Sequence, residues 1–574
     1  MHPKTAAPSP ICGRIELMQL LACLAALLLL GPADLFAARQ PVRAKRAMVV
    51  TVETHATDVG VEVLKSGGNA IDAAVAIGFA LAVTHPSAGN LGGGGFMLAR
   101  FADGRTTFID FRERAPTAAT RDMYLDSKGG TTDESIVGYK ASGVPGTVRG
   151  LEYAHSKYGK KPWADLVTPA RDLAAKGFPV SFGLAGYLRS KKDLLGKSPD
   201  SKRIFLRENH HYEPGEVLVQ LDLARTLDRI KQQGAKDFYE GETARLLAAD
   251  MQSHGGLITL ADLKDYAVVE RKPLTGSYRG FEIVTAPPPS SGGVGILQML
   301  GVLEKTEYEK SGAGSAVSIH MMTETMRHFF ADRSEFFGDP EFFTVPIPRL
   351  LDPTYLAGIR NSIDQDHATP SLKVHPGQAG PQESPQTTHF TIADAEGNVV
   401  SVTYTLNGGF GSGVTASKLG FLLNNEMDDF SAKPGTPNMY GLIQGEANAI
   451  QPKKHPLSAM TPTIVLRRGQ FYFALGSPGG PTIINTVLET IVNVLDFKMN
   501  IQQAVDFPRF HHQWLPDELR LEPGFSPDTM AILEARGHKL KFVTSQGEVA
   551  AIMLDGGWLQ GAADGRAEGT AKGF

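Results

Sequence analysis

Two adjacent threonines, Thr387 and Thr388, open a β-prone segment directly after a stretch rich in proline and glutamine. A threonine hydroxyl is a weak nucleophile unless a base lies beside it. A free α-amino group on the same residue can be that base, because its unperturbed pKa is about 7.7–8.0. This chemistry requires a cut between Gln386 and Thr387. Without such a cut, the two threonines are simply β-formers that begin a strand.

A glycine pair, Gly479 and Gly480, offers a second catalytic element. It lies between a predicted strand, 470–475, and a predicted helix, 482–495, with Pro481 suited to the first helical position. The first N–H groups of a helix have no intrahelical partner, and glycine lets a substrate oxygen approach closely. These groups could form an oxyanion hole for acyl transfer. An ordinary strand-to-helix turn would have the same sequence.

Charged side chains occur in two segments that could recognise a small zwitterion. Residues 111–116 end a predicted strand and contain Arg112 and Arg114, and an arginine can hold a carboxylate with two parallel hydrogen bonds. Residues 424–429 offer carboxylates that could hold an ammonium group. Each segment also has a simpler interpretation, as a solvated arginine pair and as a capped helix start or acidic loop.

Other motifs predict no cofactor. The glycine-rich residues 89–95 lack the Gly-Lys-Ser/Thr ending of a phosphate loop and lead into a strand, so nucleotide binding is not expected. The histidine pairs at 210–211 and 511–512 lack the spacing of a metal site. The two cysteines, Cys12 and Cys23, fall in an N-terminal segment that we expect to be removed. We therefore expect neither a metal nor an organic cofactor.

The N-terminus and the net charge bear on location and partners. Residues 17–31 form an apolar run that is short for a membrane span and suits a signal-peptide core, with Ala37 and Ala38 available for cleavage. We expect a signal peptide, 1–38, and a periplasmic or secreted protein with no membrane contact after cleavage. An uncleaved anchor is the alternative. The net charge of -4 argues against a nucleic-acid partner.

Hydrophobic spacing predicts mixed α and β structure, with antiparallel strands covered by helices. Helices are expected over 58–83, broken at 67–69, and over much of 146–335. Strands are expected at 96–101, 106–111, 387–393, 399–406 and 470–475, and a turn at 394–398 joins two of them as a hairpin.

Residues 374–386 contain several prolines and glutamines and show no apolar periodicity. We expect them to form an exposed, mobile linker. A flexible linker that leads directly into a core strand is unusual. It makes Thr387 a candidate for a newly exposed chain end.

Eight motifs in one order resemble those of the γ-glutamyltranspeptidase family. They are PSAGNLGGGGFML at 86–98, DFRERAP at 110–116, PQTTHF at 385–390, TYTLN at 403–407, LLNNEMDDFSAKPG at 422–435, PLSAMTPT at 456–463, GSPGG at 476–480 and DFPRFHHQW at 506–514. The resemblance implies an α+β fold, a four-layer αββα sandwich of the N-terminal-nucleophile hydrolases. It also implies one precursor, or zymogen, split into a large subunit, 39–386, and a small subunit, 387–574, which interleave in one domain as a heterodimer.

The resemblance implies catalytic roles for four residues and a site of self-cleavage. The precursor would cut itself between Gln386 and Thr387, and Thr387 would then be the catalytic nucleophile. Thr405 matches the second threonine, which hydrogen-bonds the hydroxyl of the nucleophile. Gly479 and Gly480 would supply the oxyanion hole.

The resemblance also implies a pocket for a γ-glutamyl group. Arg112 would hold the α-carboxylate with help from Ser458, and Tyr440 would lie on a loop that covers the pocket. The α-amino group would be received by Asn407, Glu426 and Asp429. Many relatives have Ser-Ser where this chain has Ser458-Ala459. The missing hydroxyl could loosen the hold on glutamyl groups or broaden the accepted acyl group.

The implied activity is that of a γ-glutamyltransferase and glutathione hydrolase. The γ-glutamyl group of glutathione or a similar compound would form an ester with the nucleophile and pass to water or to the amine of an amino acid or peptide. One alternative keeps the fold and acts as an acylase on glutaryl-β-lactams or other side-chain amides. Another is a processed but inactive binding protein.

Overall fold

The structure is a computed structural model that describes residues 39–207, 211–374 and 387–574. The predicted signal peptide, 1–38, and Gln386 lie outside the described residues, as does nearly all of the predicted linker. No helix of the described residues is long and apolar enough to cross a membrane.

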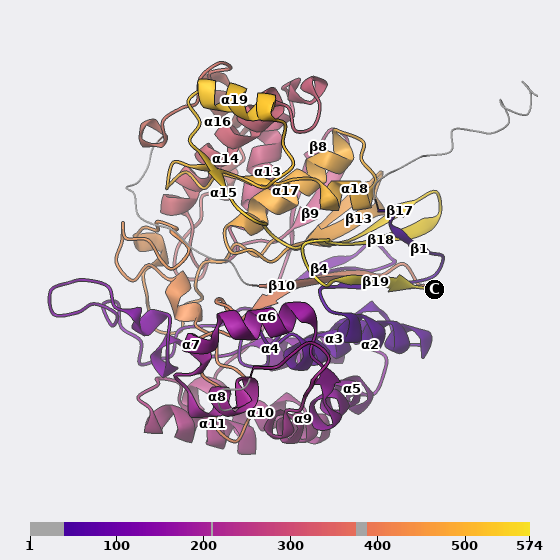
Figure 1. The fold of residues 1–574 in the computed structure, drawn as a ribbon, viewed down its shortest axis with the longest axis vertical. Helices are drawn as coiled ribbons and strands as arrows, with labels where there is room; N and C mark the ends of the chain where they lie inside the picture. Colours follow the sequence, from indigo (N-terminus) through magenta and orange to yellow (C-terminus); the bar gives the residue numbers. More distant parts are fainter. Residues whose placement is uncertain (1–38, 208–210, 375–386) are drawn as a thin grey trace, which may run out of the picture. The chain divides into compact units, whose positions relative to one another are not determined.

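Two seven-stranded sheets lie at the centre of the unit formed by 41–574 (Figure 1). The first sheet has the order β1 (Val42–Ala44), β18 (Trp558–Ala563), β17 (Ala550–Asp555), β13 (Gln470–Gly476), β12 (Thr463–Arg467), β9 (Phe281–Thr285) and β8 (Leu274–Tyr278). The second has the order β19 (Thr570–Gly573), β2 (Met48–Thr51), β10 (Thr388–Ala393), β11 (Val399–Thr405), β3 (Gly94–Arg100), β4 (Thr106–Phe111) and β7 (Val269–Arg271). Neighbouring strands in both sheets are antiparallel.

Helices cover the outer face of each sheet (Figure 1). Beside the first sheet lie α13 (Gly292–Leu303), α14 (Ala316–Phe336), α17 (Thr482–Leu495) and α18 (Ile501–Asp506). Beside the second lie α2 (Thr54–Lys65), α3 (Ala70–Thr84), α4 (Thr147–Tyr158) and α5 (Trp163–Lys176). One hydrophobic core joins the facing sides of the two sheets and the helices on the first, and another joins the second sheet to its helices. These layers confirm the predicted α+β class with its αββα order.

The remaining elements surround this sandwich. The other helices are α6 (Phe182–Ser190), α7 (Lys192–Leu195), α8 (Pro199–Phe205), α9 (Leu221–Gln233), α10 (Ala235–Glu240), α11 (Glu242–Ser253), α12 (Leu260–Lys264), α15 (Ile347–Leu350), α16 (Pro353–Ser362) and α19 (Pro527–Ala535). The smaller strands are β5 (Phe178–Pro179), β6 (Val217–Leu218), β14 (Phe510–His511), β15 (Leu519–Leu521) and β16 (Leu540–Phe542).

Most predicted elements occur close to their expected bounds. Helices α2 and α3 are separated at 66–69, where Asn69 caps α3 with its side chain, and β10 and β11 form the expected hairpin. Strand β3 begins at Gly94, earlier than expected, because its glycines pair with the end of β11. Pro481 is the residue that caps α17 and not its first helical residue.

Each central sheet takes strands from both sides of residue 386. The first sheet combines β1, β8 and β9 with β12, β13, β17 and β18 from the C-terminal part. In the second sheet, β10 and β11 lie between β2 and β3. A chain cut at residue 386 would therefore leave two pieces that share both sheets.

The chain just before the undescribed segment 375–386 is held in place. The indole N–H of Trp514 donates to the carbonyls of Ser371 and Val374, at 2.8 and 3.0 Å. The carboxylate of Asp517 accepts from the backbone N–H and the hydroxyl of Ser371, at 3.1 and 2.8 Å. The segment therefore runs from an anchored residue, Val374, to the start of a core strand.

Candidate active site

Thr387 lies immediately before β10 and lines a pocket. Its exposed fraction is 6%, and β10 pairs with β11 so that Thr388 faces Tyr404. One step further along this register, Thr387 comes opposite Thr405. Both line a small cavity whose other walls are Arg112, Arg333, Asn407, Glu426, Asp429, Tyr440, Leu442, Ser458, Ala459, Met460, Gly480, Pro481 and Ile483. Residues predicted from six separate motifs thus meet in one cavity.

The glycine-rich segment that does not match a phosphate loop holds Thr405 in place. The side-chain nitrogen of Asn90 donates to the carbonyl of Thr405 at 2.8 Å. The side-chain oxygen of Asn90 accepts from Gly93 N at 3.0 Å and from the Thr147 hydroxyl at 2.6 Å. A Cβ atom on Gly93 would lie 2.1 Å from the carbonyl oxygen of Thr405. Glycine is therefore required for close packing, and Asn90 is a positioning residue that the sequence patterns did not reveal.

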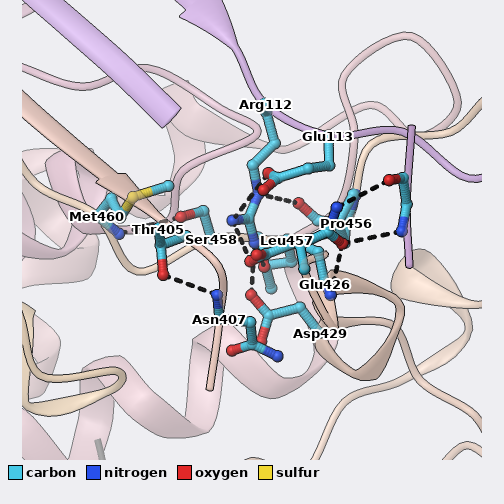
Figure 2. Close-up of polar contacts among 12 residues, drawn as sticks. Arg112, Glu113, Thr405, Asn407, Glu426, Asp429, Pro456, Leu457, Ser458 and Met460 are labelled. Carbon is cyan, nitrogen blue, oxygen red and sulfur yellow. Dashed lines mark hydrogen bonds and ion pairs between the residues drawn. The ribbon is translucent and has the colours of Figure 1, made fainter. Parts of the chain in front are cut away.

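Asn407 is fixed by hydrogen bonds on several sides. Its backbone N–H donates to the Thr405 hydroxyl at 2.8 Å (Figure 2). Its carbonyl accepts from the Tyr440 hydroxyl at 2.6 Å, and its side-chain nitrogen donates to the Asn425 carbonyl at 2.9 Å. The backbone adopts φ 72, a left-handed conformation that asparagine tolerates better than most residues. With the side-chain nitrogen engaged, the side-chain oxygen is the atom suited to accept from an ammonium group.

Arg112 is already paired with acids of the pocket (Figure 2). Its exposed fraction is 1%, and its two terminal nitrogens form ion pairs with Glu426 and Asp429. Its Nε donates to the Pro456 carbonyl at 3.3 Å, and Nη2 donates to the Leu457 carbonyl at 3.2 Å. Arg112 therefore joins the end of β4 to the acidic segment and to the segment that contains Ser458.

Three carboxylates, those of Glu426, Asp429 and Glu113, surround the buried guanidinium of Arg112. Burial lowers the pKa of Arg112, but Glu426, Asp429 and Glu113 outweigh burial and raise it above its usual range. Oε2 of Glu113 lies 3.7 Å from Nη1 of Arg112. Burial raises the pKa of Glu113 to about 7, although the positive charge of Arg112 lowers it. Burial also raises the pKa of Glu426 well above normal, opposed by Arg112 and reinforced by Glu113 and Asp429. Ionisation of either glutamate is therefore coupled to the other.

Ser458 and a second arginine lie at another wall of the pocket. The Ser458 hydroxyl accepts from Met460 N at 3.1 Å, so its hydrogen can be donated elsewhere. Arg333, on α14, donates from Nε to the Ser291 hydroxyl at 2.8 Å. The sequence patterns did not reveal Arg333, because it lies in a long helical segment with no local catalytic signal. Ala459, beside Ser458, lines the pocket without a side-chain donor.

The glycine turn before α17 adopts backbone conformations that favour glycine. Gly479 has φ 140 and Gly480 has φ 54. A Cβ atom on Gly479 would lie 2.3 Å from the Thr482 hydroxyl, and one on Gly480 would lie 3.1 Å from the Tyr440 ring. Gly480 lines the cavity directly, whereas Gly479 lies one residue behind it. Within the described backbone, neither N–H has an acceptor, so both can donate to a ligand.

The other sequence candidates lie elsewhere. Arg114 pairs with Asp265 at 3.1 Å near the surface. The nitrogen and oxygen atoms of His320, Glu324 and His538 lie within 4.8 Å of one another, a group that sequence spacing did not reveal and that could hold a metal ion. In this structure, His320 and His538 hydrogen-bond each other at 2.8 Å, and Arg327 pairs with Glu324.

Comparisons with known proteins show the family to which this chain is similar. The gamma-glutamyltranspeptidase family model matches residues 56–574. The glutathione hydrolase proenzyme of Escherichia coli (strain K12) is 51% identical over 92% of this chain and 91% of its own length. The crystal structure of a cephalosporin acylase from Bacillus halodurans matches with a TM-score of 0.83 and 27% identity, covering 95% of this chain and 99% of the other. A chain of Helicobacter pylori gamma-glutamyltranspeptidase matches with a TM-score of 0.56 and 43% identity, covering 60% of this chain and 97% of the other.

Proposed function

Because this chain belongs to the γ-glutamyltranspeptidase family, we propose that it is a self-cleaving γ-glutamyltransferase and glutathione hydrolase. One observation carries the proposal: Thr387 lies in the same small cavity as Arg112, Glu426, Asp429 and Gly480. A nucleophile, a charged receptor for an amino acid and an oxyanion donor are the parts that γ-glutamyl transfer requires.

Self-cleavage uses the Thr387 hydroxyl. Its oxygen attacks the carbonyl carbon of Gln386, the peptide C–N bond breaks, and the released nitrogen becomes the α-amine of Thr387. Water then hydrolyses the resulting ester, which frees the hydroxyl and leaves a carboxylate on Gln386. The word proenzyme in the name of the Escherichia coli relative supports self-cleavage of a precursor. The Helicobacter pylori chain supports it too. That chain matches 60% of the present chain, which is close to the fraction of the present chain that the proposed large subunit, residues 39–386, would make up.

The same hydroxyl then performs γ-glutamyl transfer. The α-amine of Thr387 takes the hydroxyl proton as the oxygen attacks the γ-carbonyl of the donor. The N–H groups of Gly480 and Gly479 stabilise the tetrahedral oxyanion, and Thr405 orients the nucleophile. The C–N bond of the donor breaks, and the leaving amine receives the proton. Water or an acceptor amine attacks the ester and releases glutamate or a new γ-glutamyl amide.

The acidic side of the pocket selects a donor with an α-ammonium group. Glu426 and Asp429 provide the negative charge, and Asn407 adds a neutral acceptor. Arg112 and Ser458 belong to the wall expected to meet the α-carboxylate, and Tyr440 closes the pocket by its bond to Asn407. Donors are therefore glutathione and related γ-glutamyl compounds, and acceptors are amino acids or dipeptides.

The mature protein is a heterodimer of 39–386 and 387–574 in the periplasm or outside the cell. Residues 1–38 act as the signal peptide. The two seven-stranded sheets support this assembly, because neither piece contains all the strands of either of them. The proposed reaction proceeds with side-chain and backbone groups alone and has no step that requires a metal, an organic cofactor, a nucleic acid or a membrane.

A second candidate function is the hydrolysis of a glutaryl amide. The whole-chain similarity to the cephalosporin acylase of Bacillus halodurans supports it, as does Ala459, which leaves room beside Ser458. A glutaryl group has the carboxylate of a glutamyl group but lacks the ammonium. Arg112 is one positive charge against the carboxylates of Glu426 and Asp429, so a glutaryl group would leave the excess negative charge of this wall unmatched, which is costly in a protein interior.

Two chromogenic substrates test the proposed function. The purified protein should hydrolyse γ-glutamyl-p-nitroanilide with a kcat/KM at least ten-fold above that for glutaryl-p-nitroanilide. Asp429→Asn should reduce this preference, because it removes one charge that faces the ammonium group. Faster hydrolysis of the glutaryl compound would favour the acylase. If the protein hydrolyses neither compound, both proposed enzymatic activities are contradicted.

A further inference from the structure

A second cluster of buried polar side chains lies outside the cavity, where α14 packs against α19 (Figure 1). It consists of His320 and Glu324 on α14 and His538 just after α19, with exposed fractions of 1%, 0% and 5%. One nitrogen or oxygen atom from each lies within 4.8 Å of the other two. None of the three lines the cavity that contains Thr387, and the proposed acyl transfer uses none of them.

Helix geometry brings the three side chains together. His320 and Glu324 are four positions apart, so they lie one turn apart on the same face of α14. Gly537 ends α19 with φ 95, a left-handed conformation that favours glycine, and the N–H of His538 donates to the Leu533 carbonyl at 3.1 Å. After this turn, the ring of His538 lies with its centre 5.1 Å from that of His320.

The hydrogen bonds of His320 leave a lone pair on its Nδ1 atom. Nε2 of His320 lies 2.7 Å from the carbonyl of Asp364, which can only accept, so Nε2 carries the proton. Nδ1 lies 2.8 Å from Nε2 of His538 and accepts from it. A histidine that binds a metal commonly donates its other N–H to a backbone carbonyl in this way. His320 is therefore already oriented as a ligand.

Two atoms of the cluster have no hydrogen-bond partner among the described residues. They are Oε2 of Glu324 and Nδ1 of His538, and both are buried. Oε1 of Glu324 pairs with Arg327 and accepts from the N–H of Thr369 at 3.2 Å. Leaving the other carboxylate oxygen buried without a partner is unfavourable. A cation bonded to Oε2 would offset that cost.

The charges around the cluster are compatible with a further cation. Arg327 is shared by two carboxylates, those of Glu324 and Asp517, the second at 3.2 Å. Burial lowers the pKa of both histidines of the cluster, so their rings are neutral at neutral pH and add no positive charge. Arg536 also acts on the cluster, but its side chain is partly exposed and solvent weakens its effect.

A small movement would admit an ion between the rings. Zinc bonds imidazole nitrogens at about 2.0–2.1 Å, so two of them in a tetrahedral site lie about 3.3 Å apart. Nδ1 of His320 and Nε2 of His538 are 2.8 Å apart, which leaves a separation of about 0.5 Å to be gained. The proton that Nε2 of His538 now donates moves to Nδ1 of the same ring. The ring stays neutral and binds through the freed lone pair.

We propose that His320, Glu324 and His538 form a zinc site that fastens the small subunit to the large subunit. Two imidazole nitrogens and a carboxylate oxygen, with water in a fourth position, are a ligand set that zinc takes in proteins. His320 and Glu324 precede the proposed cut and His538 follows it, so the ion bridges the two fragments. The bridging role rests on the proposed self-cleavage, whereas the site itself does not.

The ion has a structural role and takes no part in the acyl transfer. Arg333 is the cavity residue on the same helix, and it lies about 14 Å further along α14 than Glu324. The zinc site therefore affects stability and subunit association, and it leaves the chemistry at Thr387 unchanged.

Zinc binding is measured on purified protein without a histidine tag. After loading with Zn²⁺ and removal of free ion, the wild-type protein should retain about one zinc ion per chain, and its Tm should exceed that of the metal-free protein by about 2 °C or more. His320→Gln and His538→Gln should each lose both effects. His328→Gln is the matched control, because His328 lies on the same helix outside the cluster, and it should keep both.

Two further measurements separate loss of the site from loss of the fold. Near-UV circular dichroism of each metal-free variant reports folding without reference to activity. If one histidine variant does not fold, the other tests the same site from the other side of the proposed cut. Co²⁺ in a tetrahedral site absorbs visible light, so the wild-type protein loaded with Co²⁺ should show bands that Zn²⁺ abolishes and that both histidine variants lack.

The bridging role has its own measurement. In the cleaved protein, Zn²⁺ should raise the guanidinium concentration at which 39–386 and 387–574 separate, and His538→Gln should abolish this rise. An unchanged concentration in zinc-loaded wild-type protein would overturn the bridging role.

The outcomes distinguish the site from the proposed function. A wild-type protein that retains no zinc and shows no rise in Tm would overturn the site. An equal rise in the wild-type protein and both histidine variants would do so too, because the ion would then bind elsewhere. If zinc binds as expected but the chain is never cut, the site stands and the proposed self-cleavage fails.

Discussion

At the scale of residues, the pocket concentrates charge that its sequence motifs only partly revealed. Glu426, Asp429 and Arg112 stood out because acidic and basic side chains cluster in short segments. Arg333 and Asn90 did not stand out. Arg333 lies within the long helix α14, which carries no local catalytic motif, and Asn90 lies in a glycine-rich segment with the composition of a loop. What these two residues do depends on contacts with chain segments far away in sequence, at Ser291 and Thr405.

The coupled glutamates predict a pH dependence. The charge of Glu113 raises the pKa of Glu426, so Glu113→Gln should lower the pKa of Glu426. If ionised Glu426 receives the ammonium group, kcat/KM for a γ-glutamyl anilide rises with pH as Glu426 loses its proton. The acid limb of the pH profile should therefore move to lower pH in Glu113→Gln.

Glu548 provides the control for this measurement. Burial raises its pKa to about 7, as it does for Glu113, but Glu548 does not line the pocket. Glu548→Gln should leave the acid limb where it is in the wild-type protein. An acid limb that moves to higher pH in Glu113→Gln would refute the coupling.

At the scale of elements, periodicity predicted the strands and helices that position the nucleophile. Strand β4 and helix α17 have the expected bounds, and β10 and β11 differ by one residue at one end. The short strands β7, β8 and β9 were not predicted, because they lie in a stretch dominated by helical patterns. Their pairing with β4 and β12 is decided by the stacked sheets and not by local preference.

The turn before α17 predicts an effect on kcat. Gly480→Ala places a side chain at φ 54 and 3.1 Å from the Tyr440 ring, so the ring or the Gly480 backbone must move. We expect kcat for γ-glutamyl anilide hydrolysis to fall about ten-fold or more, because an N–H group stabilises the oxyanion only when it points at that oxygen in the transition state. The free energy of unfolding should fall by about 1–2 kcal/mol.

Gly469→Ala is the matched control. Gly469 has φ 75 in the turn between β12 and β13, and a Cβ atom there would meet nothing within 4 Å. It should show a similar loss of stability and an unchanged kcat. If both variants lose kcat equally, the effect is backbone strain and not oxyanion geometry.

At the scale of the whole molecule, the αββα layers bring together motifs that lie hundreds of residues apart. The ordered motifs implied this architecture through family resemblance, whereas periodicity alone indicated only antiparallel strands covered by helices. The order of strands within each sheet could not be predicted locally, because β10 and β11 pair with strands from the N-terminal part of the chain.

The shared sheets predict how the cleaved protein behaves. Fragments 39–386 and 387–574 should elute together in native size-exclusion chromatography and separate only in denaturant, because parting them would expose the middle strands of both sheets. The measurement is the elution volume of cleaved protein with and without guanidinium. Separate elution under native conditions would contradict the interleaved assembly.

The most direct test of the account is the N-terminal sequence of the smaller fragment of the purified protein, read beside an activity assay. We predict two bands on a denaturing gel, with the smaller one beginning Thr387-Thr388-His389-Phe390, and a single inactive band for Thr387→Ala. A wild-type protein that remains one uncut chain and still hydrolyses γ-glutamyl amides at full rate would contradict it.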